Sequence, residues 1–148
     1  MIQSVAFIGL GAMGYRMAAH LVKHFDHVWV WNRNLSKAEA HAKQYGSQAV
    51  QLEQAVQADV IFSCLPTSQD VYDLIQRVTL KSGSVWVDCT SGVPETARLL
   101  HQQLKAQGIG FLDAPVSGQT IGAEKGTLTV MIGGDALDVE RALPAIQC

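Results

Sequence analysis

Short apolar runs alternate with amphipathic segments along the whole chain. The apolar runs are rich in β-branched and aromatic residues, which favour strands, and they occupy residues 5–8, 27–31, 60–64, 84–88, 110–112 and 127–132. Apolar residues recur at helical spacing in the other segments, which are residues 13–23, 36–45, 52–57, 68–78, 94–107 and 137–146. Ser36 can cap the second of these helices, and Pro94 suits a first helical turn. The alternation predicts an α/β protein with a doubly wound parallel sheet, in which ligands bind at the carboxyl edge of the sheet.

The turn between the first strand and the first helix is rich in glycine and matches the pattern GxGxxG. In this setting Gly9 permits the tight turn, Gly11 lets the backbone approach a pyrophosphate, and Gly14 lets the helix pack closely on the strand. The N–H groups and the positive dipole end of the helix then face the phosphates. The alternative is a tight turn that binds nothing. The residues predicted to contact a dinucleotide here are Gly9, Leu10, Gly11, Ala12, Met13 and Gly14.

The end of the second strand bears on the choice of cofactor. About 20 residues after the glycines, an acidic side chain usually accepts hydrogen bonds from the adenosine ribose of NAD, but this chain has Asn32, Arg33 and Asn34. The neutral amide of Asn32 tolerates the 2′-phosphate of NADP, which a carboxylate would repel. The guanidinium of Arg33 offers a fork of donors to phosphate oxygens. These three residues predict NADP in preference to NAD, unless Arg33 is only a solvated surface cation.

Two motifs about a hundred residues apart resemble one known family. Residues 7–14, Phe-Ile-Gly-Leu-Gly-Ala-Met-Gly, look like the opening of the β-hydroxyacid dehydrogenases, which include 3-hydroxyisobutyrate dehydrogenases and tartronate semialdehyde reductases. Residues 113–128, Asp-Ala-Pro-Val-Ser-Gly-Gln-Thr-Ile-Gly-Ala-Glu-Lys-Gly-Thr-Leu, are similar to that family's DAPVSGGxxGAxxGTL. The resemblance covers essentially the whole chain. It implies that residues 1–148 are a dinucleotide-binding domain of the Rossmann type, the N-terminal NADP-binding domain of such an enzyme.

The resemblance also implies contacts to the cofactor from two further segments. Leu65 and Pro66 would line the dinucleotide, although a simple turn at the start of a helix is the alternative. Ser91 stands where the family has a threonine that contacts the nicotinamide end. A serine keeps the hydroxyl group but loses the methyl group that restricts the threonine rotamer. Alternatively, Ser91 belongs to a cluster that caps the helix at Pro94.

The prediction of the substrate-binding residues concerns one segment, which is Ser117, Gly118 and Gln119. The resemblance implies that this segment orients the acid group of the substrate, and small side chains here would expose backbone N–H groups that suit a carboxylate. Gln119 departs from the family, which usually has a second glycine at this position. If the position requires a positive φ, glutamine costs about 1 kcal/mol there. The alternatives are an unusual substrate, binding through the Gln119 amide, or a purely structural loop.

Composition and charge exclude several other classes of function. A net charge of −2 gives no broad positive field for nucleic acid or an anionic membrane. The three cysteines, Cys64, Cys89 and Cys148, have no spacing typical of disulfides or zinc, and His20 and His24 lack the nearby glutamate of a zinc motif. We therefore predict no metal. No apolar run approaches the ~20 residues of a membrane span, so we expect a soluble, cytoplasmic protein.

The resemblance also implies a reaction, but this sequence lacks the family's general acid/base. The family moves a hydride between nicotinamide and a small 3-hydroxy acid or its semialdehyde, and a lysine acts as general acid/base on a long helix that begins a second, all-helical domain. No residue matches that lysine, because the sequence ends at Cys148 and Lys125 lies in the substrate segment. We therefore expect this chain to bind NADP without turnover, with a parent enzyme that is a homo-oligomer.

Other functions stay open at this point. Imine reductases share the opening and often the Asn-Arg pair at the end of the second strand. A non-catalytic dinucleotide-binding module is a further alternative. A sugar phosphate substrate is disfavoured, because 6-phosphogluconate dehydrogenases typically have Gly-Pro-Ser where residues 126–128 are Gly-Thr-Leu.

Overall fold

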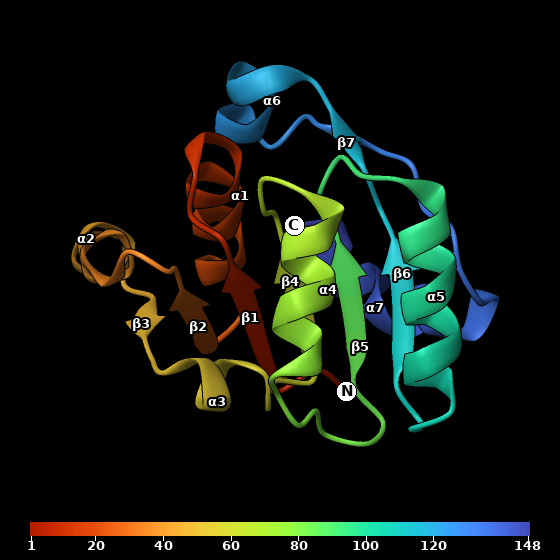
Figure 1. Cartoon of the computed structure of the whole chain (residues 1–148). Coiled ribbons are helices and arrows are strands. Elements are labelled where there is room, and N and C mark those ends of the chain that lie inside the picture. Colours follow the sequence, from red (N-terminus) through yellow and green to blue (C-terminus); the bar gives the residue numbers. More distant parts are fainter.

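The chain forms a parallel sheet with helices packed on both faces (Figure 1), in a computed structural model that describes residues 1–148. The strands are β1 (Ser4–Ile8), β2 (His27–Trp31), β3 (Gln48–Ala49), β4 (Val60–Ser63), β5 (Val85–Asp88) and β6 (Gly110–Asp113). They are parallel and lie in the order β3-β2-β1-β4-β5-β6. The strand order therefore reverses beside β1, and this switch point is where doubly wound sheets bind ligands.

Two hydrophobic cores hold the helices against the sheet. On one face, Val5 and Phe7 of β1 lie in a cluster with residues of α1, α2 and α7. On the other face, Ala6 and Ile8 lie in a cluster with residues of α3, α4 and α5. Because neighbouring strand residues point to opposite faces, a strand buried on both faces is a nearly continuous apolar run. The predicted doubly wound fold is confirmed. The helices are α1 (Ala12–Val22), α2 (Leu35–Tyr45), α3 (Leu52–Ala55), α4 (Ser68–Gln76), α5 (Pro94–Lys105) and α7 (Ala136–Ile146).

None of these helices combines the length and the apolar character that a membrane crossing requires.

The start of α2 differs from the prediction. Asn34, not Ser36, is the N-cap residue, and its side-chain oxygen accepts hydrogen bonds from the Ser36 backbone N–H at 3.1 Å and from the Ser36 hydroxyl at 2.6 Å. Asparagine and serine cap helices about equally well, so the choice between them was not decided by residue type. Gly46 ends the helix with a φ of +87°, as in many glycine-terminated helices.

A buried histidine connects α2 to α1. The Nε2 atom of His41 lies 2.9 Å from the Tyr15 carbonyl oxygen, and its Nδ1 atom lies 2.6 Å from the Ser47 hydroxyl oxygen. A carbonyl oxygen only accepts hydrogen bonds, so Nε2 carries the proton and Nδ1 accepts from Ser47. Burial lowers the pKa of His41, which favours this neutral form. The second half of α2 is thereby held against the first turns of α1.

The segment after β6 differs most from the prediction. The strand predicted at residues 127–132 does not join the parallel sheet: only β8 (Thr129–Val130) is a strand, and it pairs antiparallel with β7 (Val116–Ser117). Between them, α6 (Gln119–Lys125) stands where a loop was expected, and it packs against α1 (Figure 1). A helix of seven residues is too short to show a periodic pattern. The exposed, two-residue β3 lacks a sequence pattern for the same reason.

Candidate cofactor site

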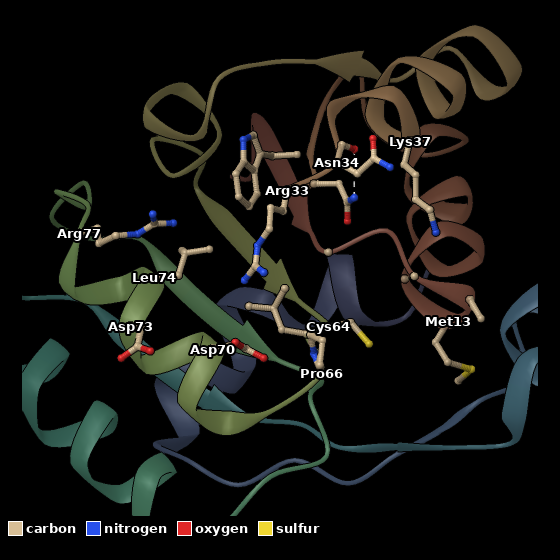
Figure 2. Close-up of a pocket in the computed structure, with 17 residues that line it drawn as sticks. Met13, Arg33, Asn34, Lys37, Cys64, Pro66, Asp70, Asp73, Leu74 and Arg77 are labelled. Atoms are coloured by element: carbon tan, nitrogen blue, oxygen red, sulfur yellow. Dashed lines mark hydrogen bonds between the residues drawn. The ribbon is translucent and has the colours of Figure 1, made fainter.

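A cavity of about 990 Å³ opens at the carboxyl ends of β1, β2 and β4, beside the switch point (Figure 2). Its walls are the glycine turn with the start of α1, the end of β2 with the start of α2, the loop after β4, and α4. All predicted cofactor residues except Leu10 and Ser91 line it. The lining residues are Gly9, Gly11, Ala12, Met13, Gly14, Trp31, Asn32, Arg33, Asn34, Lys37, Cys64, Leu65, Pro66, Asp70, Asp73, Leu74 and Arg77.

The three glycines of the turn have different surroundings. Gly9 has a φ of +97°, and a Cβ atom there would overlap the Cys64 carbonyl oxygen. A Cβ atom on Gly14 would overlap the Gly9 carbonyl oxygen. The fold itself therefore requires glycine at these two positions. Gly11 is exposed and has an ordinary φ of −73°, and a Cβ atom there would meet nothing within 4 Å. The protein does not need glycine at position 11, so the open space in front of it is available to a ligand.

The first turn of α1 has no side-chain cap. The first N–H groups of a helix have no partner inside the helix, so an uncapped start offers them to an anion. Leu10 has a different role from its neighbours: its side chain is buried in the core, and its backbone N–H donates to Oδ1 of Asn32 at 2.8 Å. The Nδ2 atom of Asn32 donates to the carbonyl oxygen of Asn34 at 3.0 Å. Asn32 thus joins the glycine turn to the end of β2.

Arg33 and Lys37 enter the cavity from the end of β2 and the start of α2, and α4 lies opposite them (Figure 2). Both cations are exposed, and neither forms an ion pair or a side-chain hydrogen bond within the chain. The carboxylates on the opposite wall are already hydrogen-bonded: Asp70 accepts from Thr67 in a capping box, and Asp73 accepts from Gln69. The β2–α2 side of the cavity is therefore a positively charged wall with unused donors.

The loop after β4 forms the floor of the cavity through Leu65 and Pro66. Burial and the nearby Asp88 carboxylate raise the pKa of Cys64, which also lines the cavity, to about 11. Its thiol is therefore protonated at neutral pH and is a poor nucleophile. Ser91 is exposed in the loop after β5 and does not line the cavity. The chain contains no group of three or more histidine, cysteine, aspartate or glutamate side chains that could bind a metal ion.

The predicted substrate residues lie apart from this cavity. Ser117 belongs to β7, and Gly118 is the N-cap residue of α6 with a φ of +133°. Gln119 begins α6 and has a φ of +57°, the one positive φ of a residue other than glycine in this chain. The condition left open by the sequence, a positive φ at this position, is therefore met in the structure. Glutamine is strained there by about 1 kcal/mol, and its side chain is exposed.

Several lining residues were not predicted from the sequence. Lys37 had a weak signal, as a lysine in the first turn of the predicted helix that follows Arg33. The residues on α4 had none, since nothing in the sequence places that helix opposite α2. The lining residues that were missed are Trp31, Lys37, Cys64, Asp70, Asp73, Leu74 and Arg77.

Comparison with known proteins identifies the family. Residues 4–148 match the NAD-binding domain of 6-phosphogluconate dehydrogenase. The chain is 38% identical to an NAD-dependent L-serine dehydrogenase of Pseudomonas aeruginosa, with 99% of this chain and 51% of the relative covered. It is also 38% identical to a 3-hydroxyisobutyrate dehydrogenase of that organism, with 97% and 50% covered. The chain therefore spans about half the length of the relatives it matches.

Solved structures agree with this assignment. The Mycobacterium tuberculosis 3-hydroxyisobutyrate dehydrogenase with L-serine superposes with a TM-score of 0.88 at 32% identity, over 99% of this chain and 52% of that one. The fold is shared with a reductive aminase of Aspergillus terreus in complex with NADPH and ethyl levulinate. That structure is 23% identical and superposes with a TM-score of 0.83, over 98% of this chain and 53% of that one. The chain therefore belongs to the family of NAD-binding domains of 6-phosphogluconate dehydrogenase, and its relatives include 3-hydroxyisobutyrate dehydrogenases, as the two sequence motifs predict.

Proposed function

We propose that residues 1–148 form the NADP-binding domain of an oxidoreductase that transfers a hydride between nicotinamide and a small 3-hydroxy acid or its semialdehyde. The observation that carries this proposal is the open space at Gly11, between two glycines that the fold requires. The uncapped start of α1 lies at the same place, and the unpaired Arg33 and Lys37 line the same cavity. Backbone N–H groups and free cations around one cavity suit the phosphates of a dinucleotide.

Each part of the cavity has a distinct task in this proposal. Gly11 and the first turn of α1 hold the pyrophosphate, and the side chains of Arg33 and Lys37 hold the 2′-phosphate. Asn32 keeps the glycine turn in place and puts no carboxylate beside that phosphate. Leu65 and Pro66 line the floor and exclude water from the nicotinamide end, with Ser91 as a further contact there. The bound cofactor supplies the hydride chemistry.

The choice of NADP rests on the chain's own residues, because the names of its relatives include both an NAD-dependent enzyme and a complex with NADPH. Titration of the unmodified chain with each dinucleotide tests it. We expect NADPH to bind at least several times more tightly than NADH, because only NADPH can use Arg33 and Lys37. Equal affinities would reject the NADP preference, and no binding of either dinucleotide would reject the proposed function.

The substrate class rests on the motif at residues 113–128 and on the names of the relatives. 3-Hydroxyisobutyrate and L-serine are both small acids with a hydroxyl group on carbon 3. In the proposal, backbone N–H groups near Ser117 and Gly118 orient the substrate carboxylate, and the amide of Gln119 adds a hydrogen bond. Imine reduction stays the second candidate, but the similarity to the reductive aminase supports a common fold and does not favour that reaction.

We expect the 148-residue chain to bind NADPH without measurable turnover. No lysine lines the floor of the cavity, because Lys37, the lysine among its lining residues, is on the 2′-phosphate side. General acid/base transfer typically contributes ~10² to 10⁴ in rate. NADPH absorbance at 340 nm, followed with 2-methyl-3-oxopropanoate (the aldehyde that corresponds to 3-hydroxyisobutyrate), tartronate semialdehyde and succinic semialdehyde, should stay at background. Steady oxidation at an enzyme-like rate would show that the catalytic group lies within these 148 residues, and Lys125→Ala would be the first variant to test.

A further inference from the structure

We propose that Asp88, Ser63 and Thr90 are positioning residues that lock the loops after β4 and β5 into one rigid unit at the floor of the cofactor cavity. The β4 loop is residues 64–67, and the β5 loop is residues 89–93. The expected effect of this unit on ligand binding rests on the proposed function, because the two loops are those that would meet the nicotinamide end of the cofactor.

The centre of the unit is a buried hydrogen-bond network at the carboxyl ends of β4 and β5. The Ser63 hydroxyl donates to Oδ1 of Asp88 at 2.8 Å, and the backbone N–H of Thr90 donates to the same oxygen at 3.0 Å. The indole N–H of Trp86 donates to the Ser63 hydroxyl oxygen at 2.9 Å. The four residues are between 0% and 6% exposed, and no buried side-chain polar atom lacks a partner. A fully satisfied network in a low-dielectric interior holds its members in one arrangement.

Two further hydrogen bonds cross from the β4 side to the β5 loop. The backbone N–H of Leu65 donates to the Thr90 hydroxyl oxygen at 3.0 Å, and the backbone N–H of Val93 donates to the Ser68 hydroxyl oxygen at 2.8 Å. Gly92 lies so close to Ser68 that a Cβ atom on it would overlap the Ser68 hydroxyl oxygen. The loops are therefore joined at both ends, by groups 25 residues apart in the sequence.

The Asp88 carboxyl group has an unusual environment for an acidic residue. It is 6% exposed and forms no ion pair with a lysine or arginine. Burial raises its pKa, the neighbouring Asp113 carboxylate raises it further, and hydrogen bonds from Thr90 and Ser63 oppose this rise. Burying a carboxylate is costly, and the hydrogen bonds that offset this cost are the ones that hold Thr90 in place. Thr90 in turn presents its hydroxyl oxygen to Leu65 and is followed directly by Ser91.

The hydrogen bonds of the unit reach the cavity at its floor, where Leu65 also lies against Gly9 of the glycine turn. Leu65 and Pro66 line the floor, whereas Gly11, Arg33 and Lys37 have no hydrogen bond to the network. A ligand that extends to the floor gains affinity from loops that are already ordered. A ligand that ends at the phosphates gains nothing from them. NADPH and its fragment 2′,5′-ADP should therefore respond differently when the unit is loosened.

Thr90→Val tests the inference, because valine keeps the shape of threonine and removes only the hydroxyl group, which accepts from the Leu65 N–H and donates to the Asp88 carboxylate. Amide hydrogen exchange of Leu65, measured by NMR without ligand, should become about tenfold faster. The dissociation constant for NADPH should rise about three- to tenfold, the effect of one hydrogen bond, and that for 2′,5′-ADP should stay the same. Thr90→Ser restores the hydroxyl group and should restore both values. Thr79→Val, at an exposed threonine outside the site, is the matched control and should change neither.

Unchanged exchange of the Leu65 amide in Thr90→Val would overturn the lock itself. Equal weakening of NADPH and 2′,5′-ADP would overturn its restriction to the floor, because it would show a general loss of stability. If the unmodified chain binds neither ligand, the proposed cofactor function fails, and the exchange rates still decide whether the two loops are locked.

Discussion

Gly11→Ala should weaken NADPH binding about 5- to 150-fold while the free energy of unfolding changes by less than about 1 kcal/mol. The methyl group would occupy the open space where the pyrophosphate must approach the backbone, and overpacking of this kind costs about 1–3 kcal/mol. The φ of Gly11 is −73°, which alanine adopts without strain, so the fold should tolerate the change. Titration with NADPH and urea unfolding of the same sample measure the two effects.

Gly9→Ala and Gly14→Ala, in contrast, should lower the free energy of unfolding. Each added methyl group would overlap a backbone carbonyl oxygen, and at Gly9 the φ of +97° adds further strain. We expect a loss of about 2–5 kcal/mol in the free energy of unfolding at Gly9 and somewhat less at Gly14, where alanine favours the helix. Gly83→Ala is the matched control, because Gly83 has a φ of +88° in open space remote from the cavity. It should lose stability without any change in binding.

Normal NADPH affinity in Gly11→Ala would contradict the pyrophosphate site.

Loss of the two unpaired cations on the β2–α2 side of the cavity should remove the preference for NADPH. Arg33→Ala and Lys37→Ala should each raise the dissociation constant for NADPH roughly tenfold, and the double variant roughly 100-fold, because each removes a charge-assisted contact to the 2′-phosphate. The affinity for NADH, which lacks that phosphate, should change little. The effect should shrink at high ionic strength, since both side chains are exposed and their field is screened.

Two further variants sharpen this test. Asn32→Asp would place a carboxylate beside the 2′-phosphate and should shift the preference toward NADH. Arg98→Ala removes an exposed, unpaired arginine elsewhere on the surface and should leave both affinities unchanged. If Arg33→Ala weakens NADPH and NADH by the same factor, the guanidinium does not recognise the 2′-phosphate, and the assignment of NADP fails.

The sequence by itself determined the class of fold and the place of the site. A strand buried on both faces is apolar at nearly every position, so β1, β4 and β5 could be recognised as runs, although each has one buried polar residue at an end. The glycine turn could be recognised because glycine at Gly9 and Gly14 follows from local geometry, with one position at a left-handed φ and the other at a close backbone contact.

Short elements and helix ends were decided by the tertiary structure. β3, β7 and β8 have two residues each, and α6 is held against α1 rather than specified by its own pattern. Residue type alone could not choose between Asn34 and Ser36 as the cap of α2. In each case a few residues carry too little local preference to outweigh the packing of neighbouring elements.

Within the site, too, some residues could be predicted from the sequence and others were brought together only by the tertiary structure. The sequence pointed to Arg33 and Asn32, because they follow a recognisable strand, but it did not show that Asp73 of α4 and Arg77 just after it line the same cavity. It also did not show that the Leu65 N–H meets the Thr90 hydroxyl. Periodicity and turn chemistry act over a few residues along the chain, whereas these contacts join residues on different elements. They exist only because β4 lies between β1 and β5 in the sheet, and that order is set by the packing of helices on both faces rather than by any local pattern.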